Sequence, residues 1–330
     1  MAFSSQDIMS FGASVIGEPE IEFTSLTGGA NNQLWHAQPK NAPSFVIKNY
    51  GADGGDRLRR EWRYLSLLEQ HKVPNLPRPL HHDAIQKLAA YSFVDGKKLL
   101  SEKISFSHIQ IAAQHISAIS DIPIGTIDRA KGSYDDAIGH IQEITDRISH
   151  LEQALQYYPH LDRLHNLVMK KLKPLWQSRY ELTIKADLNL LFSDVKLYLS
   201  PSDFGFHNIL ATEKTLNFID FEYAGADDLA KLAADFSLVP QIPIPNEYAA
   251  SFITQLAQTI GLDAYFEPRV AFLRFIGQIK WACIILNEFL PEKKQRLSDA
   301  SDRGASERRE ERLTLAEEFF ERYEMTEFTP

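Results

Sequence analysis

Cysteine is almost absent from this chain. One of its 330 residues is a cysteine, Cys283, which lies in the apolar run 279–286. A single cysteine in apolar surroundings is usually a small buried hydrophobic side chain. The sequence therefore excludes a disulfide framework and a thiolate metal site.

The sequence also lacks long hydrophobic runs and an excess of positive charge. No uninterrupted apolar run approaches the roughly 18 residues that a membrane-spanning helix needs. Residues 1–7 do not show the basic and apolar pattern of a secretory signal. Lys and Arg number 35 against 44 Asp and Glu, so the net charge is −9, and no basic surface for nucleic acid or anionic lipid is expected. We expect a cytoplasmic protein that binds neither nucleic acid nor membrane.

The residues that are present predict a folded protein with two lobes. Hydrophobic residues make up 44% of the chain and aromatic residues 11%, which is enough for packed cores. At 330 residues the chain is longer than a single core usually supports. Strand signals dominate residues 1–95 and helical signals dominate residues 96–330. We predict an α+β fold with a small antiparallel-sheet N-lobe, a large mainly helical C-lobe and a boundary at Asp95-Gly96.

The expected elements follow from periodicity and from helix-breaking residues. One helix is expected at 57–71, because the prolines of 73–79 end it. Residues 81–83 are expected in a solvated loop, since no third metal ligand lies at a useful spacing. The remaining expectations are strands at 21–26, 33–37, 44–50 and 88–94, and helices within 134–190 and at 227–238, 247–260, 270–289 and about 305–323.

The most informative segment, residues 200–223, contains Asp203, Asn208 and Asp220. Residues 209–211 and 216–219 read as strands joined by a turn. Pairing about position 214 would place Asn208 opposite Asp220, with Cα atoms about 4.5–5.5 Å apart.

Two oxygen-bearing side chains at that separation could share one Mg²⁺, which prefers oxygen ligands. Asp203 would then be left to orient a hydroxyl nucleophile, as phosphoryl transfer requires. The alternative is that each of the three residues is an ordinary turn or cap former.

A second group of residues could hold nucleotide phosphates. Glu61 shares one helical face with Leu58, Leu65 and Leu68, and a buried carboxylate is costly without a partner. We predict that Lys48, in an apolar strand, pairs with Glu61 and reaches the α- and β-phosphates. The alternatives are an edge strand that leaves Lys48 in solvent, and a Glu61 that lies beside a neighbouring arginine.

Gly28 and Gly29 lie in the turn between the first two strands. Without Cβ atoms, their backbone N–H groups can approach an anion closely. Adjacent glycines are also common as plain turn formers. The glycines alone are weak evidence, and the neighbouring site residues make this turn a candidate phosphate contact.

Together these residues resemble the aminoglycoside phosphotransferase and choline kinase superfamily, which has the protein-kinase-like fold. The turn 26–32, Lys48 and Glu61 follow in family order. Residues 203–208 resemble the catalytic loop and residues 219–225 the metal-binding segment. The resemblance is strongest over 200–236, moderate over 20–70 and architectural elsewhere.

The resemblance implies roles for individual residues. Asp203 would be the catalytic base, and Asn208 and Asp220 would be the magnesium ligands. Lys48, supported by Glu61, would contact the phosphates. The turn of Gly28 and Gly29 would cover these phosphates. One of three aspartates would anchor the catalytic loop from the next helix: Asp227, Asp228 or Asp235.

The chain departs from the family pattern directly before Asp203. Family members usually have His-Gly there, and this chain has Pro201-Ser202. The family's histidine orients the site and does not react. His207 could supply a compensating hydrogen bond, or it could be a structural histidine.

The predicted function is that of an ATP-dependent O-phosphotransferase. It would use Mg²⁺ and a small hydroxylated acceptor: a metabolite, sugar, amino-alcohol or aminoglycoside-like molecule. By the family's habit the acceptor pocket would lie in the helical lobe, with Lys280, Asn287 and Glu288 as candidate border residues. The sequence does not predict the acceptor or the oligomeric state.

Two rival functions have to be compared with this prediction. A protein kinase is disfavoured because no Ala-Pro-Glu segment follows Asp220 and the next helix leaves no room for a peptide-docking loop. A non-catalytic nucleotide-binding scaffold is suggested by Pro201-Ser202. The joint presence of Lys48, Asp203, Asn208 and Asp220 argues against it.

Overall fold

The computed structural model describes residues 5–17, 20–26, 32–51, 54–185, 188–291 and 302–323. The chain divides into two compact units. The first contains residues 1–131 and 197–227, and the second contains residues 132–196 and 228–330. This division does not follow the lobes expected from the sequence, and a lobe boundary at Asp95-Gly96 stays a prediction.

The first unit contains a five-stranded antiparallel sheet with the order β1-β2-β3-β5-β4. Four of its strands confirm the sequence prediction, and β4 was expected to be a loop. Because β3 is the central strand, the alternative that Lys48 lies on an edge strand is wrong. The strands are β1 (Ile21–Leu26), β2 (Gln33–Pro39), β3 (Phe45–Asn49), β4 (Pro79–Asp83) and β5 (Leu88–Ser92).

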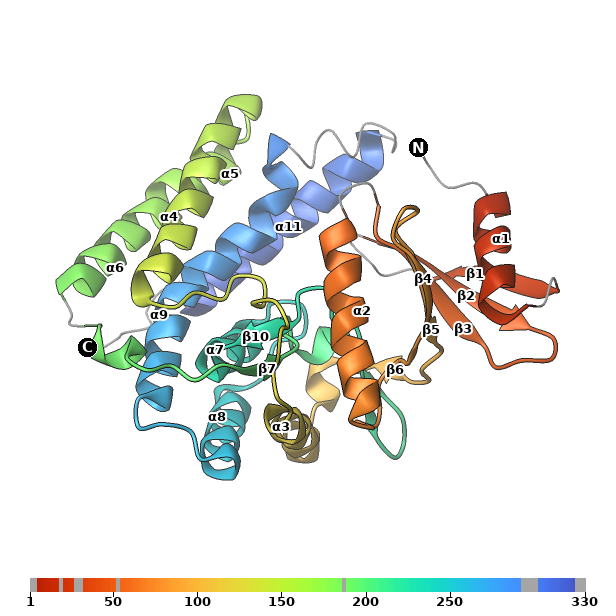
Figure 1. Ribbon diagram of the computed structural model, residues 1–330. Helices are drawn as coiled ribbons and strands as arrows, with labels where there is room; N and C mark the ends of the chain where they lie inside the picture. Colours follow the sequence, from red (N-terminus) through yellow and green to blue (C-terminus); the bar gives the residue numbers. More distant parts are fainter. Residues whose placement is uncertain are drawn as a thin grey trace. The chain divides into compact units, whose positions relative to one another are not determined.

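The two faces of this sheet carry different helices (Figure 1). Helix α1 (Ser5–Ile16) packs on one face, where its Ile8 and Phe11 join Phe45 and Ile47 of β3 in a buried core. Side chains alternate along a strand, so Lys48 points to the opposite face. Helix α2 (Gly55–Gln70) presents its buried stripe there, and that stripe includes Glu61, as the periodicity predicted.

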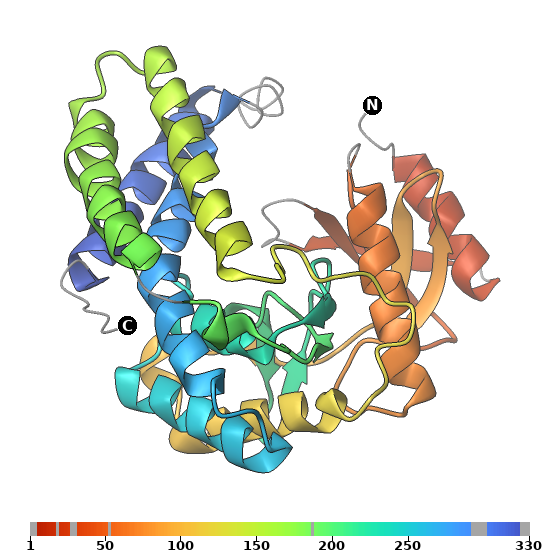
Figure 2. The same ribbon diagram turned by 60° about the vertical axis from the view of Figure 1, so that its left-hand side comes forward.

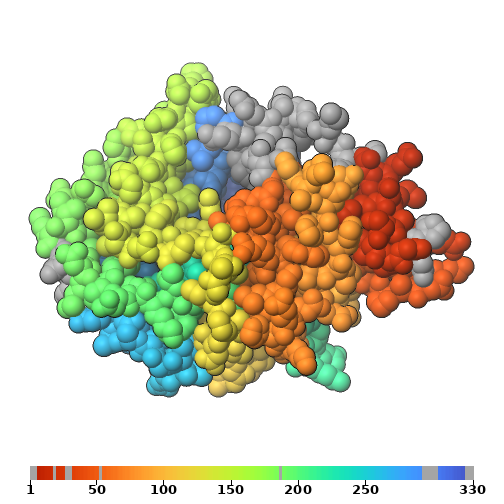
Figure 3. Space-filling view, viewed as in Figure 1, coloured from red at the N-terminus to blue at the C-terminus, as the bar shows by residue number. Residues whose placement is uncertain are grey.

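Helix α2 is also tied to the connector that follows α3. Arg59 and Arg63 pair with Asp128, and Arg60 donates to the carbonyl of Arg129. Figure 3 shows this connector, in yellow, against α2, in orange. The helix that carries Glu61 is therefore held from the sheet side and from this outer side.

The other described residues of the first unit form one α-helix, short strands and two 3₁₀ turns. Strands β6, β8 and β9 form a three-stranded sheet, and β7 pairs with β10. Helix α3 packs against β7 and β9. The bounds are α3 (Phe106–Ser120), β6 (Lys97–Lys98), β7 (Tyr198–Ser200), β8 (Ile209–Ala211), β9 (Leu216–Phe218) and β10 (Gly225–Asp227).

The second unit is helical over its described residues (Figure 2). Helix α9 is its centre, since it packs against α4, α7 and α11. Cys283 of α9 is buried, as expected, and burial raises the pKa of its thiol to about 12. The helices are α4 (Ala137–Ala154), α5 (Asp162–His165), α6 (Lys173–Lys185), α7 (Leu229–Leu238), α8 (Asn246–Ile260), α9 (Phe266–Ile285) and α11 (Asp302–Tyr323).

Among the described residues, one helical stretch, Phe266–Phe289, is long and apolar enough to cross a membrane. An 18-residue window of it has a mean hydropathy of 1.4, and 72% of that window is buried inside the protein. The charged residues within it interrupt every apolar run, so the sequence showed no run of this length. A central helix surrounded by other helices needs this apolar composition for packing.

Candidate active site

The hairpin that carries two of the predicted site residues forms, but its register differs by one residue from the prediction. In the structure Ile209 pairs with Phe218 and Ala211 with Leu216. Thr212 donates its backbone N–H to the Thr215 carbonyl at 2.9 Å, which closes a four-residue turn. The pairing centre therefore lies between residues 213 and 214.

This register sets Asn208 opposite Ile219, so the expectation that Asn208 faces Asp220 is wrong. Ile219 donates its N–H to the Asn208 carbonyl at 3.0 Å. Asp220 follows the strand and has a φ of +66°. Aspartate is one of the few residues that tolerate this left-handed conformation, and the turn that it makes redirects the chain beyond β9.

Asp203 lies in the loop between β7 and the short 3₁₀ turn Phe206–Asn208. Asn208 holds the loop closed, since its Nδ2 donates to the Asp203 carbonyl at 3.0 Å. The same Nδ2 lies 3.4 Å from Oδ2 of the Asp203 carboxylate. His207 places Nε2 3.2 Å from Oδ1. The loop thus brings an amide donor and an imidazole nitrogen to one carboxylate.

Ser202, directly before Asp203, has a φ of +63°. That conformation is strained for a residue with a Cβ and natural for glycine, which accounts for the glycine usual in the resembling family. Two hydrogen bonds hold Ser202 in place: its N–H donates to Ser200 Oγ at 3.0 Å and its hydroxyl donates to the Lys131 carbonyl at 3.2 Å. Strain of this kind is concentrated at functional sites.

Lys48 is surrounded by carboxylates. Its Nζ lies 2.7 Å from Glu61 Oε2, 2.7 Å from Asp220 Oδ1 and 3.6 Å from Glu222 Oε2. The predicted Lys48–Glu61 pair is therefore present, and Glu61 does not rely on a neighbouring arginine. Glu61 also accepts hydrogen bonds from the Tyr50 hydroxyl at 2.6 Å and from the Phe221 N–H at 3.1 Å.

This arrangement sets the charges of the site. Burial alone would lower the pKa of Lys48, but Asp220, Glu61 and Glu222 raise it well above its usual value. Burial would raise the pKa of Asp220, yet Lys48 holds it below the usual range. Burial raises the pKa of Glu61 despite Lys48. Asp220, whose side chain is 39% exposed, is the most accessible carboxylate of the three.

Sequence reasoning missed a second layer around Glu222. Asn32 Nδ2 donates to Glu222 Oε2 at 2.7 Å, and Arg57 donates to the same oxygen at 3.1 Å. Arg57 also donates to Asn32 Oδ1 at 2.7 Å and to the Tyr50 carbonyl at 2.6 Å. The sequence signal that could have indicated this layer is the carboxylate of Glu222, which lies two residues after Asp220 between Phe221 and Tyr223.

Gly28 and Gly29, which form the predicted phosphate turn, lie outside the described residues. Asn32, the first described residue after the turn, is held by Glu222 and Arg57. The downstream end of the turn is therefore fixed to the segment that follows Asp220.

The three aspartates that could anchor the catalytic loop have different surroundings. Asp227 is fully buried in β10 and lies opposite Tyr198 of β7, the strand that leads into the Asp203 loop. Asp228 caps α7 and pairs with Arg269 at 2.9 Å. Asp235 pairs with two lysines of the helical unit. The anchoring role stays a prediction, and Asp227 is the candidate that adjoins the loop's own strand.

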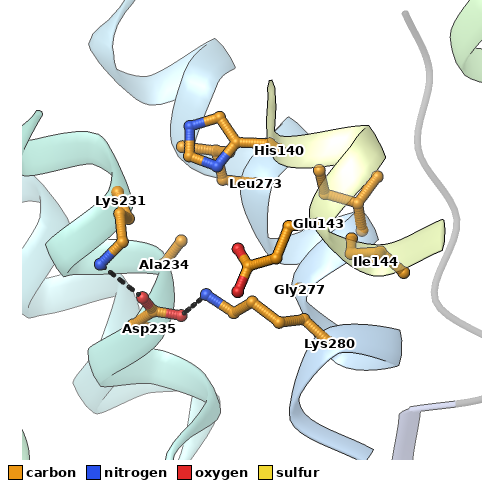
Figure 4. A pocket seen from close by; sticks show the side chains of 10 residues that line it. His140, Glu143, Ile144, Lys231, Ala234, Asp235, Leu273, Gly277 and Lys280 are labelled. Atoms are coloured by element: carbon orange, nitrogen blue, oxygen red, sulfur yellow. Dashed lines mark hydrogen bonds and ion pairs between the residues drawn. The ribbon is translucent and has the colours of Figure 1, made fainter. Parts of the chain in front are cut away.

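Asp235 lines a small pocket between α4, α7 and α9 (Figure 4). Lys231 Nζ lies 3.1 Å from its Oδ2, and Lys280 Nζ lies 2.5 Å from its Oδ1. Lys280 therefore lines this pocket, and its place at the border of an acceptor pocket stays a prediction. Asn287 and Glu288 are not among the residues that line it.

Solved structures of small-molecule kinases share this fold. A choline kinase from Cryptosporidium parvum Iowa II matches with a TM-score of 0.65 and 16% identity over 97% of this chain and 96% of that chain. An ethanolamine kinase from Plasmodium vivax matches with a TM-score of 0.62 and 15% identity over 94% and 86%. A spectinomycin phosphotransferase, solved with ADP and spectinomycin, matches with a TM-score of 0.63 and 15% identity over 97% and 99%.

These similarities confirm the predicted α+β, protein-kinase-like fold with an antiparallel-sheet N-terminal region and a helical C-terminal region. No curated protein matches the chain in sequence. The model of the phosphotransferase enzyme family matches residues 22–270, which is well over half of the chain and includes the Lys48 cluster, Asp203 and Asn208. The chain therefore belongs to the phosphotransferase enzyme family, as the resemblance in its sequence predicted.

Proposed function

We propose that this protein transfers the γ-phosphate of ATP to a hydroxyl group of a small molecule, with Mg²⁺. One observation carries the proposal: a single ammonium group, Lys48 Nζ, lies 2.7 Å from both Glu61 and Asp220. Lysine–glutamate pairing beside a metal-binding aspartate is the arrangement that phosphoryl transfer in this fold requires. Membership of the phosphotransferase enzyme family supports the same reaction.

The donor set fits magnesium. Asn208 and Asp220 offer an amide oxygen and an ionised carboxylate, and Mg²⁺ usually takes only one or two ligands from protein. Oxygens of Glu61, Asp220 and Glu222 lie within 4.8 Å of one another. Lys48 lies among these three oxygens, so we assign the metal to Asp220 and Asn208. When bound, the ion would neutralise the charge of the transferring phosphoryl group.

The nucleotide would meet the same face of the sheet. Lys48 would contact its α- and β-phosphates, and the Gly28-Gly29 turn would cover them. The adenine is proposed to lie along the connector at 91–95. Tyr91 donates to or accepts from Tyr50 at 2.8 Å inside the core, so the connector would offer mainly its residues 92–95. ADP-bound and ATP-bound aminoglycoside phosphotransferases share the fold.

Asp203 would align the acceptor hydroxyl and accept its proton. Its side chain is 30% exposed, so a hydroxyl can approach the carboxylate, while His207 and Asn208 hold it. Catalysis would then come mainly from positioning and from charge stabilisation. Structures that share the fold include kinases of choline, ethanolamine and spectinomycin by name. We extend to this chain only their shared chemistry, a small hydroxylated acceptor.

The test is consumption of Mg-ATP in the presence of a panel of hydroxylated metabolites, sugars, amino-alcohols and aminoglycosides. Asp203→Ala should lower turnover by about 10²- to 10⁴-fold, the usual contribution of a general base, and still bind Mg-ATP. Glu213→Ala, in the exposed turn of the same hairpin, is the matched control and should behave as wild type. Normal turnover in Asp203→Ala would contradict the assignment. Mg-ATP binding without turnover on any acceptor would favour the scaffold alternative.

A further inference from the structure

His207 is the one titratable side chain that touches the Asp203 carboxylate among the described residues. Its Nε2 lies 3.2 Å from Asp203 Oδ1, and its side chain is 13% exposed. Its other ring nitrogen, Nδ1, is buried and has no hydrogen-bond partner in the described part of the chain. The ring therefore has a single polar contact, and that contact is Asp203.

The local backbone explains how the ring reaches Asp203. His207 lies four residues after Asp203 in the 3₁₀ turn Phe206–Asn208, which folds the chain back toward the start of the loop. Asn208 fixes the turn through the Asp203 carbonyl. Ser202 cannot serve instead, since its hydroxyl donates to the Lys131 carbonyl.

The contact also specifies the tautomer. Beside an ionised carboxylate, Nε2 has to carry the proton, because a bare Nε2 would place two lone pairs against each other. A neutral ring then leaves Nδ1 without a proton. The opposite tautomer would bury an unpaired N–H and repel Asp203, so two costs would be incurred at once.

We propose that His207 is a positioning residue for the catalytic carboxylate. Its Nε2–H holds Asp203 Oδ1, which leaves Oδ2 to receive the acceptor's hydroxyl proton. Within the described part of the chain, Oδ2 has only the 3.4 Å contact to Asn208, so it is the less engaged oxygen. This role rests on the proposed phosphotransferase function and adds to it a residue that acts through Asp203.

Kinetics on three variants test the role. His207→Leu should lower kcat by about 10- to 100-fold, the usual effect of a misplaced catalytic group, with the KM for Mg-ATP nearly unchanged. His207→Gln should recover part of the loss, because its amide can donate to the same carboxylate. His150→Gln, an exposed histidine of α4, is the matched control and should equal wild type.

A double variant separates positioning from folding. If His207 acts through Asp203, His207→Leu should cost nothing further in the Asp203→Ala background. Additive losses, or a normal kcat in His207→Leu, would overturn the proposal.

A measurement without turnover keeps the two proposals distinct. Nitrogen-15 NMR of histidine-labelled protein at pH 8, with His207 identified by its loss in His207→Gln, should show the Nε2–H tautomer, and Asp203→Ala should shift its signals. An Nδ1–H tautomer would overturn the inference even if the enzyme is active. An inactive wild type that binds Mg-ATP would overturn the proposed function, and the tautomer would then decide whether His207 holds Asp203.

Discussion

Each of the two units contains a buried ionic cluster, and the two clusters are opposite in design. In the first unit one ammonium group, Lys48, lies among three carboxylates. In the second unit one carboxylate, Asp235, lies between two ammonium groups and also accepts from the indole of Trp281 at 2.9 Å. Both clusters cost free energy to bury, which only good geometry and full pairing offset.

The difference lies in what each cluster leaves available. Around Lys48, three carboxylates face two cations, Lys48 and Arg57, and Asp220 keeps an accessible side chain. Such a cluster can accept a further cation from solution. Both oxygens of Asp235 are occupied by donors from α7 and α9. We infer that the first cluster exchanges partners during function, whereas the second holds helices together.

The largest effect is expected from Lys48→Met. Removing the ammonium leaves Glu61, Asp220 and Glu222 close together, and breaking a buried pair costs about 3–5 kcal/mol of unfolding free energy. Turnover should fall by about 10²- to 10³-fold, as for other transition-state donors. Added Mg²⁺ should stabilise this variant more than wild type in chemical denaturation, because the ion can occupy the carboxylates. Equal stabilisation of both proteins would contradict the inference that the Lys48 cluster can accept a cation from solution.

Asp235→Asn should affect stability and leave nucleotide binding intact. The change leaves Lys231 and Lys280 without the carboxylate between them, so we expect a loss of about 3 kcal/mol. Urea denaturation measures the loss, and calorimetric titration measures the affinity for Mg-ATP. A weaker affinity in a folded Asp235→Asn protein would show that the second cluster is not purely structural.

The Asp235 cluster should also respond to acid. Burial would raise the pKa of Asp235, but Lys280 and Lys231 hold it well below the usual value. Its folded pKa is therefore lower than the unfolded value of about 3.9. Asp235 contributes its full stability above about pH 4 and loses it as the pH falls further, by up to about 1.4 kcal/mol per pH unit. Between pH 5 and pH 2 the unfolding free energy of wild type should fall more steeply than that of Asp235→Asn. Parallel curves would contradict this.

The smallest effect is expected from Glu222→Gln. The amide can still accept from Asn32 and Arg57, so only the charge 3.6 Å from Lys48 is lost. A change of about 1 kcal/mol or less in stability is expected, in the range of one hydrogen bond, with a modest change in the KM for ATP. Glu143→Gln, whose partner is Arg147 in the helical unit, is the matched control and should leave that KM unchanged. A loss as large as that of Lys48→Met would make Glu222 a principal site residue.

The predictable parts of the site were those with a local period. Helical spacing placed Glu61 on an apolar face, and its pairing with Lys48 followed from the cost of a lone buried charge. The register of the hairpin was missed by one residue because its centre depends on how the turn closes, here by Thr212 and Thr215.

Other features had no local signal. Helix α1 is identified by its packing on the sheet. Strand β4 begins at Pro79 and is largely polar and exposed, so it lacks the alternation of a half-buried strand. The contacts of Asn32 and Arg57 with Glu222 join residues 190 and 165 positions apart. Only the folded chain brings such residues together.

The buried Cys283 is a natural probe of local opening in the helical unit. It is the only thiol in the chain, it lies in the central helix α9, and burial raises its pKa to about 12. A thiol in that state reacts with alkylating reagents only when the surrounding helices open. The rate at which the native protein is alkylated therefore measures local opening of the helical unit around Cys283, without any engineered label.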